Sequence, residues 1–103
     1  MHPAIFLDRD GVIIENQPAY VRSWDDVQFI PQALVALARL RDSLFKIVIV
    51  TNQSAIGRGQ ITLSEADSIN RRLVQVIEKA GGRIDGVFMC PHAPIDQDRK
   101  SVV

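Results

Sequence analysis

The stretch Ile5–Ile14, which reads IFLDRDGVII, decides the fold that we predict for this chain. Three apolar residues run directly into Asp8 and Asp10, and Gly11 follows. The apolar run is too short for a helix and is typical of a buried strand, so the two carboxylates fall where that strand ends. In open α/β sheets, ligands bind outside the carboxyl ends of the strands, and glycine allows a sharp turn close to a ligand. The stretch therefore predicts a strand that leads into an acidic site.

Two aspartates separated by one residue can serve three kinds of chemistry. Their oxygens can bind a metal ion, one carboxylate can act as a nucleophile that forms an acyl phosphate, and the other can act as acid and base. The spacing argues against a calcium-binding loop, because the positions that require glycine and glutamate hold Ile13 and Ala19. The remaining alternative is that the two aspartates form only a polar turn after a strand. The residues further along the chain argue against this alternative.

Length and composition narrow the class of protein. The 103 residues fit one domain, residues 1–103, and 47% hydrophobic with 23% charged residues is typical of a soluble globular protein. Basic and acidic residues both number 12, so no basic excess indicates a nucleic acid or a membrane surface as partner. The single cysteine, Cys90, excludes an intrachain disulfide and favours a reducing, cytoplasmic compartment. We expect neither a secretory signal nor a membrane span, because no apolar run is long enough.

Apolar runs predict three strands. In chain order they are Ile5–Asp8, Phe45–Val50 and Ile84–Met89. The second is a continuous β-branched run of the kind that is buried on both faces of a parallel sheet. Because helical patterns separate the strands, we predict an α/β fold with a Rossmann-like parallel sheet and flanking helices. Residues that follow the three strands would then meet at one edge of the sheet.

Two helices are predicted between these strands. The first begins at Pro31, where a missing N–H costs least, and ends at Asp42–Ser43. The second follows a capping box made by Thr62 and Glu65 and ends at Gly81–Gly82. Their apolar faces comprise Ala33, Leu34, Leu37, Ala38 and Leu40 in the first helix, and Leu63, Ala66, Ile69, Leu73, Val76, Ile77 and Ala80 in the second.

Residues 11–30 have no clear periodicity and are typical of a functional loop or flap. Gly11–Glu15 and Val27–Ile30 are strand-like and could pair as a small hairpin. The aromatic residues of the flap are expected to pack within it rather than to form a ligand cage; they are Tyr20, Trp24 and Phe29.

Polar residues also follow the second predicted strand. Thr51 could donate its hydroxyl to a phosphoryl oxygen, and Asn52 with the backbone N–H groups after it could add donors. Arg58, in a loop punctuated by glycines, could hold a second anionic group of a substrate. A strand-ending turn is the competing interpretation of Thr51 and Asn52. Beside Asp8 and Asp10 at the same sheet edge, phosphate chemistry becomes the better prediction.

Three blocks of sequence, in this order, carry a resemblance to a known family. The blocks FLDRDGVI, TNQSAIGRG and CPH begin at Phe6, Thr51 and Cys90. Together they resemble the haloacid dehalogenase superfamily and, within it, the D-glycero-D-manno-heptose 1,7-bisphosphate phosphatases and the related histidinol-phosphate phosphatases. The resemblance extends from residue 5 to about residue 100, and the three blocks in order are far more specific than the two aspartates alone.

The resemblance implies a Mg²⁺-dependent phosphatase of small phosphorylated metabolites that works through an aspartyl phosphate. Asp8 would be the nucleophile, and Asp10 would protonate the leaving oxygen and then activate water. The Asp8 side chain and the Asp10 carbonyl would hold Mg²⁺. Thr51 would stabilise the phosphoryl group, and Lys100 would neutralise its charge. The substrate-binding residues implied by the resemblance are Asn52, Gln53, Ser54, Arg58 and Arg99.

The chain departs from the family pattern at a possible zinc site. The second cysteine pair of the family is missing, so Cys90 and His92 would be two ligands where structural zinc requires four. Asp96 or Asp98 could substitute as oxygen ligands. The favoured interpretation is a free buried thiol and a loop histidine without zinc.

A second departure concerns the magnesium site. The sequence stops at Val103, whereas the family continues with another strand and an acidic Gly-Asp motif. We therefore expect the N-terminal part of the family core, with an incomplete Mg²⁺ site and Ile5–Leu7 as an exposed apolar edge. Such an edge could pair with a second copy of the chain as a homo-oligomer.

Two further functions stay open at this point. Histidinol phosphate is the alternative substrate to a heptose bisphosphate. A function of another class is a non-catalytic, truncated fragment that binds phosphate or a partner chain.

Overall fold

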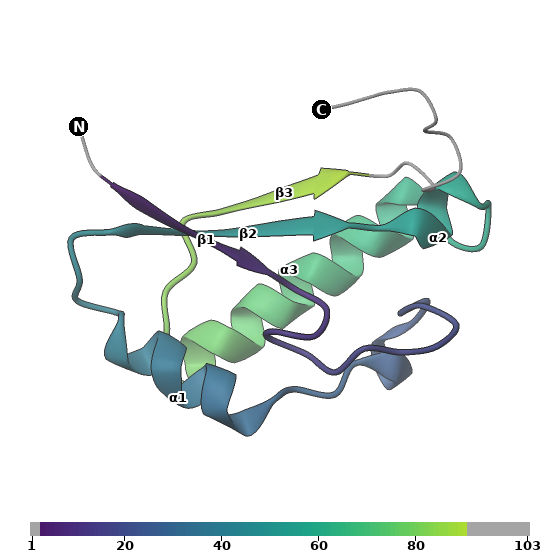
Figure 1. Ribbon diagram of the computed structural model, residues 1–103. Helices are drawn as coiled ribbons and strands as arrows, with labels where there is room; N and C mark the ends of the chain where they lie inside the picture. Colours follow the sequence, from purple (N-terminus) through teal and green to yellow (C-terminus); the bar gives the residue numbers. More distant parts are fainter. Residues whose placement is uncertain (1–2, 91–103) are drawn as a thin grey trace.

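The computed structural model describes residues 3–90, which form one parallel sheet with helices (Figure 1). The elements in chain order are β1 (Ala4–Asp8), the 3₁₀ helix η1 (Trp24–Asp26), α1 (Pro31–Arg39), β2 (Lys46–Asn52), α2 (Ser54–Gly57), α3 (Leu63–Lys79) and β3 (Gly86–Cys90). The strand order is β1-β2-β3, and both strand pairs are parallel. The predicted α/β architecture is therefore confirmed.

The strand register brings the predicted site residues to one edge of the sheet. Asp8, the last residue of β1, pairs with Val50, and Asn52, the last residue of β2, pairs with Cys90 of β3. The three carboxyl ends lie on the same side because the strands are parallel. The sheet order also makes β1 an edge strand among the described residues, as expected for Ile5–Leu7. Pairing of this edge with a second copy stays a prediction.

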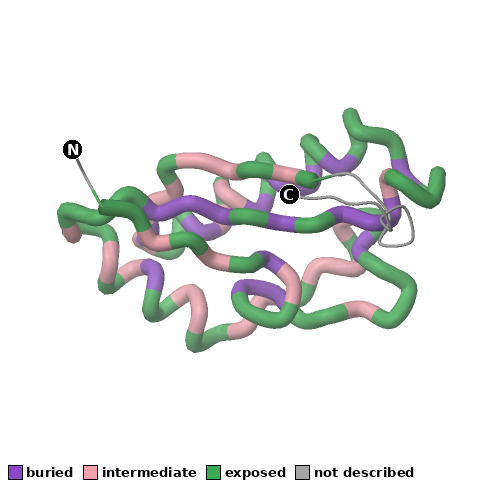
Figure 2. Tube along the Cα trace, turned by 45° about the horizontal axis from the view of Figure 1, so that its top comes forward, coloured by how far each residue is buried: buried purple, intermediate pink, exposed green. Residues whose placement is uncertain are grey.

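Helices α1 and α3 lie together on one face of the sheet (Figure 1). Burial alternates along β1, because successive side chains point to opposite faces, whereas in β2 the residues Ile47–Ile49 are all buried (Figure 2). On the helix side, Ile47 and Ile49 are fully buried. On the other side, Phe6 is 66% exposed and Phe88 is 65% exposed. In β2 this face carries Val48, which is 9% exposed, and Val50, which is 38% exposed, so the prediction that the second strand is buried on both faces holds for Val48 and is wrong for Val50.

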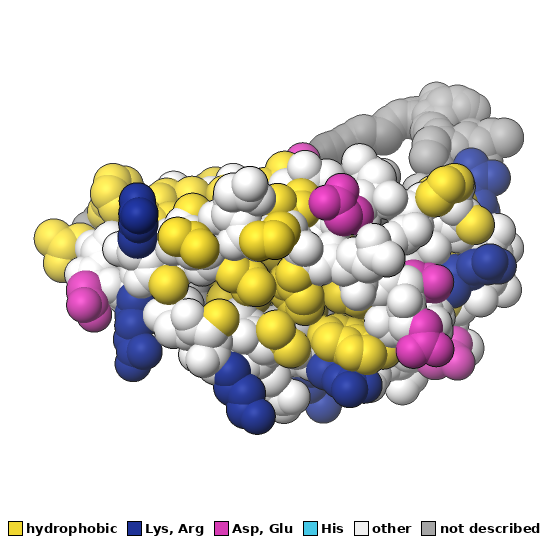
Figure 3. All heavy atoms as spheres, turned by 90° about the horizontal axis from the view of Figure 1, so that it is seen from below, with side chains coloured by type: hydrophobic (Ala, Val, Ile, Leu, Met, Phe, Trp, Pro, Cys, Tyr) yellow, Lys and Arg dark blue, Asp and Glu magenta, His cyan; other side chains and the backbone are white. Residues whose placement is uncertain are grey.

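The core joins the sheet, both long helices and the flap. Its buried apolar residues are Ile13, Ile14, Val21, Leu37, Ile47, Ile49, Ala55, Ile61, Ala66, Ile69, Leu73 and Ile77. Three of these belong to the flap, so the flap is anchored in the core. Figure 3, seen from below Figure 1, shows apolar side chains between Lys and Arg side chains on this side of the molecule. No helix within residues 3–90 is both long and apolar enough to cross a membrane.

The flap contains less regular structure than a hairpin. Its two strand-like segments meet only in an isolated antiparallel bridge between Ile14 and Phe29. Trp24 packs edge-on against Phe29, with ring centroids 6.3 Å apart, which confirms internal packing for these two aromatic residues. Tyr20 lines a pocket, so its packing within the flap stays a prediction.

Several predicted boundaries need correction. The first helix ends at Arg39 rather than Asp42–Ser43, because successive tight turns follow, in which Ser43 N–H donates to the Leu40 carbonyl. β2 extends to Asn52 because its pairing with β3 continues that far. In α3 the capping box of Thr62 and Glu65 is confirmed. Leu63, however, is exposed at the start of that helix and does not belong to its buried face.

The third strand begins at Gly86 rather than Ile84, because the Ile47 N–H donates to the side chain of Asp85 and not to a backbone carbonyl of that segment. The Asp85 carboxylate accepts a hydrogen bond from the Ile47 N–H at 2.8 Å. It also forms an ion pair with Arg83, whose Nε atom is 3.2 Å away. Arg83 also donates to the carbonyls of Arg41 and Phe45, which precede β2. These contacts fasten the start of β3 to the start of β2, and the Ile47 hydrogen bond in particular lowers the pKa of Asp85 below its ordinary value of 3.8.

We expect Asp85→Asn to destabilise the fold by about 1.5 kcal/mol at pH 7, because a charge-assisted hydrogen bond to backbone is weakened. A carboxyl whose native pKa is lowered stabilises the fold above its ordinary pKa of 3.8, and this contribution is lost as the pH falls through the native pKa. Urea unfolding of both proteins from pH 7 to pH 2 measures the difference. Asp67→Asn is the matched control, because Asp67 forms an exposed ion pair within α3. A difference that is the same at every pH would contradict this role of Asp85.

Candidate active site

The turn after β1 is built around Gly11. The Arg9 carbonyl accepts hydrogen bonds from the N–H groups of Ile13 and Ile14 at 2.9 and 3.1 Å, and Gly11 N–H donates to the Ile14 carbonyl at 2.7 Å. Gly11 has a φ of +85°, and an added Cβ would lie 2.7 Å from the Asn16 side-chain nitrogen. Only glycine fits this position. The turn directs the chain from β1 into the flap and leaves Asp10 beside it.

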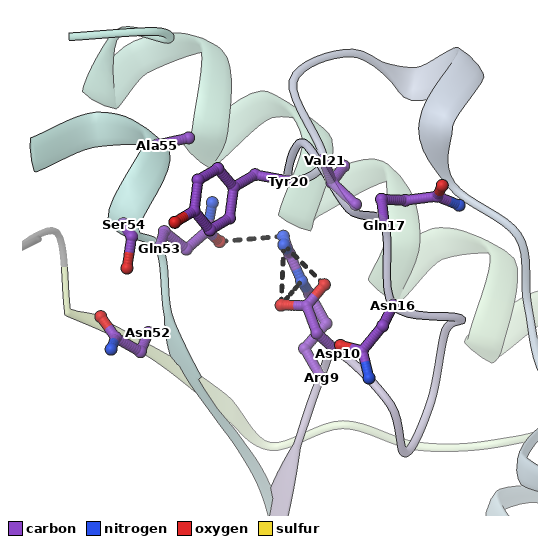
Figure 4. Close-up of a pocket in the computed structure, with 10 residues that line it drawn as sticks. All are labelled: Arg9, Asp10, Asn16, Gln17, Tyr20, Val21, Asn52, Gln53, Ser54 and Ala55. Atoms are coloured by element: carbon purple, nitrogen blue, oxygen red, sulfur yellow. Dashed lines mark hydrogen bonds and ion pairs between the residues drawn. The ribbon is translucent and has the colours of Figure 1, made fainter. Parts of the chain in front are cut away.

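A pocket of about 210 Å³ lies between this turn, the flap and the end of β2 (Figure 4). Its lining residues are Arg9, Asp10, Asn16, Gln17, Tyr20, Val21, Asn52, Gln53, Ser54 and Ala55. Of the predicted site residues, the structure brings Asp10, Asn52, Gln53 and Ser54 together here. The fold therefore gathers carboxylate and amide groups at the predicted edge of the sheet.

Arg9 is the most buried charged residue of the site, with a side chain that is only 3% exposed. Its Nε and Nη2 atoms contact the Asp10 carboxylate at 3.1 to 3.2 Å. Its Nη1 atom donates to Gln53 Oε1 at 2.9 Å and to Asn70 Oδ1 at 2.8 Å. Figure 4 shows the guanidinium between Asp10 and Gln53. The buried charge is thus paired and hydrogen-bonded, as burial requires.

These contacts fix the orientation of the Gln53 amide. Its Oε1 atom accepts from both Arg9 and Asn70, the latter at 2.8 Å. Because two donors meet this atom, it must be the oxygen, and Nε2 takes the other position. Within residues 3–90 no group accepts a hydrogen bond from Gln53 Nε2. The amide therefore has two N–H donors available to a ligand in the pocket.

Asp8 and Thr51 lie at the same edge but do not line the pocket. Asp8 is exposed at the end of β1, two residues before Asp10. Thr51 is 1% exposed, and its hydroxyl has no hydrogen-bond partner among the described residues. An unpaired buried hydroxyl costs free energy, so a ligand that accepted a hydrogen bond from Thr51 would remove this cost.

Arg58 lies against the flap rather than in the pocket. Its guanidinium is 5.8 Å from the centre of the Tyr20 ring, a cation–π contact at the weak end of the range. Tyr20 has a φ of 65°, which is unusual for a residue with a side chain. Tyr20 lines the pocket on its flap side, and Arg58 contacts the ring of Tyr20 without lining the pocket.

The donor atoms at this edge suit Mg²⁺. Mg²⁺ prefers oxygen ligands and is commonly bound through one or two carboxylates together with substrate phosphate and water. The Asp8 carboxylate and the Asp10 backbone carbonyl provide two oxygens within three residues of chain, and Asn52 adds an amide oxygen at the pocket. The residues present therefore fit a magnesium ion held partly by its substrate.

The part of the chain that the structure describes contains no cluster of side chains that could bind zinc. Within residues 3–90 no three His, Cys, Asp or Glu side chains cluster. Cys90 is a free thiol and is exposed, so the expectation of a buried thiol is wrong. His92, Asp96, Asp98, Arg99 and Lys100 lie outside the described residues, and their predicted roles stay predictions.

Comparisons with known proteins agree with this fold. No family model matches the chain. It is 38% identical over 92 residues to a D-glycero-beta-D-manno-heptose-1,7-bisphosphate 7-phosphatase of Bordetella bronchiseptica, covering 89% of this chain and 51% of the relative. A phosphatase of the same name from Yersinia pestis is 39% identical over 92 residues, covering 89% and 48%. The chain spans about half the length of the curated relatives it matches.

Solved structures give the same result. A crystal structure of D,D-heptose 1.7-bisphosphate phosphatase from B. bronchiseptica, complexed with magnesium and phosphate, has a TM-score of 0.84 at 37% identity, covering 91% of this chain and 52% of the other. A putative haloacid dehalogenase-like phosphatase from Mesorhizobium loti has a TM-score of 0.79 at 34% identity, covering 87% and 43%.

The fold defines the class of protein: the described sheet and helices are part of the haloacid dehalogenase-like phosphatase fold. Within this class, the chain is a homologue of the D-glycero-beta-D-manno-heptose-1,7-bisphosphate 7-phosphatases, and the resemblance predicted from its three sequence blocks is confirmed.

Proposed function

We propose that the protein is a Mg²⁺-dependent phosphatase that hydrolyses a phosphomonoester of a small sugar through an aspartyl phosphate. The observation that carries the proposal is the meeting of Asp8, Asp10, Thr51 and Asn52 at one sheet edge. Homology to heptose bisphosphate phosphatases supports D-glycero-D-manno-heptose 1,7-bisphosphate as substrate, with histidinol phosphate as the alternative. The cytoplasmic location stays a prediction.

In the proposed first step, a carboxylate oxygen of Asp8 attacks the phosphorus atom. The bond from phosphorus to the sugar oxygen breaks, and this oxygen takes a proton from the Asp10 carboxyl group. The products are an aspartyl phosphate on Asp8, a free sugar hydroxyl and an Asp10 carboxylate. Mg²⁺, when bound, neutralises charge on the phosphoryl oxygens.

In the second step, the Asp10 carboxylate takes a proton from water while the water oxygen bonds to phosphorus. The bond between phosphorus and the Asp8 oxygen breaks, which releases phosphate and restores both side chains. Thr51 Oγ and Gln53 Nε2 are available to donate to the phosphoryl oxygens during both steps. We further propose that Asn52, Ser54, Arg58 and Arg99 contact the substrate and that Lys100 neutralises phosphoryl charge.

Release of phosphate tests this function. A panel that contains the heptose bisphosphate, histidinol phosphate and simple sugar phosphates would be measured with and without Mg²⁺. Preference for the heptose bisphosphate supports the proposed substrate, and preference for histidinol phosphate supports the alternative. Binding of phosphate without turnover of any substrate would instead indicate a non-catalytic protein.

Thr51→Val gives a prediction that separates catalysis from folding. Valine keeps the shape of threonine and removes a hydroxyl that has no partner among the described residues, so stability should be equal or higher. Loss of a hydrogen bond to a charged phosphoryl group should raise the activation free energy by about 1.5–3 kcal/mol, which lowers kcat/KM roughly ten- to a hundredfold. Steady-state kinetics and thermal unfolding measure the two effects, with Thr51→Ser as the control that keeps the hydroxyl. Unchanged kinetics in Thr51→Val would leave Thr51 as a residue of the strand only.

A further inference from the structure

We propose that Arg9 is a positioning residue that holds the Asp10 carboxylate in its working place in the pocket. This inference rests on the proposed phosphatase function, in which Asp10 is the acid and base. It assigns a task to a buried charge that the proposed chemical steps do not use.

The hydrogen bonds of Arg9 indicate that it acts through Asp10 rather than on a substrate. Arg9 makes three contacts to the Asp10 carboxylate, one to Gln53 and one to Asn70, and its side chain is only 3% exposed. A phosphoryl group in the pocket therefore has little access to the guanidinium. Both oxygens of Asp10 are engaged, and such a two-point contact fixes the orientation of a carboxylate as well as its place.

Arg9 is itself held by residues from two other elements. Gln53 follows β2, and Asn70 is a buried residue of α3. Asn70 also donates to Gln53 Oε1 at 2.8 Å and contacts Met89 Sδ of β3 at 3.4 Å. The guanidinium is thus fixed to the body of the fold. Asp10 has a side chain that is 29% exposed and lies on a turn, so without Arg9 few contacts would fix it.

This arrangement predicts an effect that a purely structural arginine would not have. Transfer of a proton to the leaving oxygen matters most when that oxygen is a poor leaving group, as in an alkyl phosphate. It matters little for a dinitrophenyl phosphate, whose leaving group departs as a stable anion. A misplaced Asp10 should therefore slow the first step selectively for the alkyl substrate, whereas general loss of structure should slow the first step of both substrates alike.

The experiment compares Arg9→Gln with wild type at saturating Mg²⁺. We expect kcat for a sugar or alkyl phosphate to fall by about 10²-fold, the effect of a small misplacement, with little change in KM. For dinitrophenyl phosphate we expect the burst rate of dinitrophenol release, which reports the first step alone, to change less than threefold. In an Asp10→Asn background, adding Arg9→Gln should cause no further loss of rate that is selective for the alkyl substrate. The reason is that the asparagine held by Arg9 has no proton to donate.

Arg71→Gln is the matched control. Arg71 follows Asn70 on α3 and also pairs with a carboxylate, that of Asp67, but its side chain is exposed. It should leave both rates unchanged. If Arg9→Gln does not fold, Arg9→Lys takes its place: lysine keeps the charge but cannot contact Asp10 at two points, so the same selective loss is expected at a smaller size.

Each outcome decides between the hypotheses. Equal loss in the first-step rates of both substrates, or a further selective loss in the Asp10→Asn background, overturns the positioning role and leaves the proposed function intact. Absence of turnover by wild type on every substrate overturns the proposed function and this inference with it.

Discussion

Asp8→Asn is expected to abolish turnover of every phosphomonoester substrate while the fold remains intact. In the proposed mechanism the Asp8 oxygen forms the bond to phosphorus, and an amide is not a competent nucleophile in its place. Asp8 lies exposed at the end of β1, and within residues 3–90 its carboxylate has no recorded ion pair. Its loss should therefore cost little stability. This is the largest effect on activity that we expect from any single substitution.

Two measurements make this test specific. Phosphate release should vanish both for a substrate with a poor leaving group and for one with a good leaving group, because the nucleophile is needed in either case. Rapid acid quench and mass spectrometry during wild-type turnover should find phosphate bound to Asp8 and none in the variant. Asp42→Asn is the control, because Asp42 is exposed and lies after α1, outside the pocket. Full activity of Asp8→Asn would show that another residue is the nucleophile.

The sheet could be predicted from sequence because its signal is local. Apolar β-branched runs such as residues 45–50 are readable without knowledge of their partners, and their alternation with helices determines a parallel sheet. The acidic turn was also predictable, because a glycine directly follows the two aspartates in the sequence. In the structure Gly11 has a φ of +85°, which favours glycine. The α3 start was predictable because both halves of its cap lie within four residues.

The uncovered face of the sheet could not be predicted in this way. An apolar run shows that a strand can be buried on both sides, but not which elements lie above and below it. Val50 alternates with Ile49 and Thr51, and only the position of the helices decides that Val50 is exposed in the described residues. The short helix α2 was missed for a related reason, because its four residues are too few to display a period.

The Arg9 network was missed although the sequence carries a signal for it. In a strand, alternate residues share a face, so Arg9 is on the side of Leu7 and the core, opposite Asp8. Asn70 is four residues after Ala66 and three before Leu73, within the buried stripe of α3. A charged residue and an amide at core positions need partners. Taken together, these two positions predict a buried polar contact between the first strand and the second long helix.

Asp10→Asn is expected to lower kcat by about 10²–10⁴-fold on sugar phosphates, which is the usual contribution of acid and base catalysis. Asparagine cannot give a proton to the sugar oxygen or take one from water. With dinitrophenyl phosphate the first step should be almost normal, and aspartyl phosphate should accumulate because its hydrolysis still needs the base. A burst of dinitrophenol followed by slow turnover would be the direct sign of this division.

The ion pair with Arg9 adds a second expected consequence. Asp10→Asn leaves the Arg9 guanidinium, 3% exposed, without its anionic partner, and an uncompensated buried charge is destabilising. Thermal unfolding should therefore occur at a lower temperature than in wild type and in Asp8→Asn. Asp10→Glu separates the two effects: it restores the charge and much of the stability, but one added methylene displaces the carboxyl, so kcat should stay low. Equal kcat in Asp10→Glu, Asp10→Asn and wild type would show that Asp10 serves the fold and not the proton transfer.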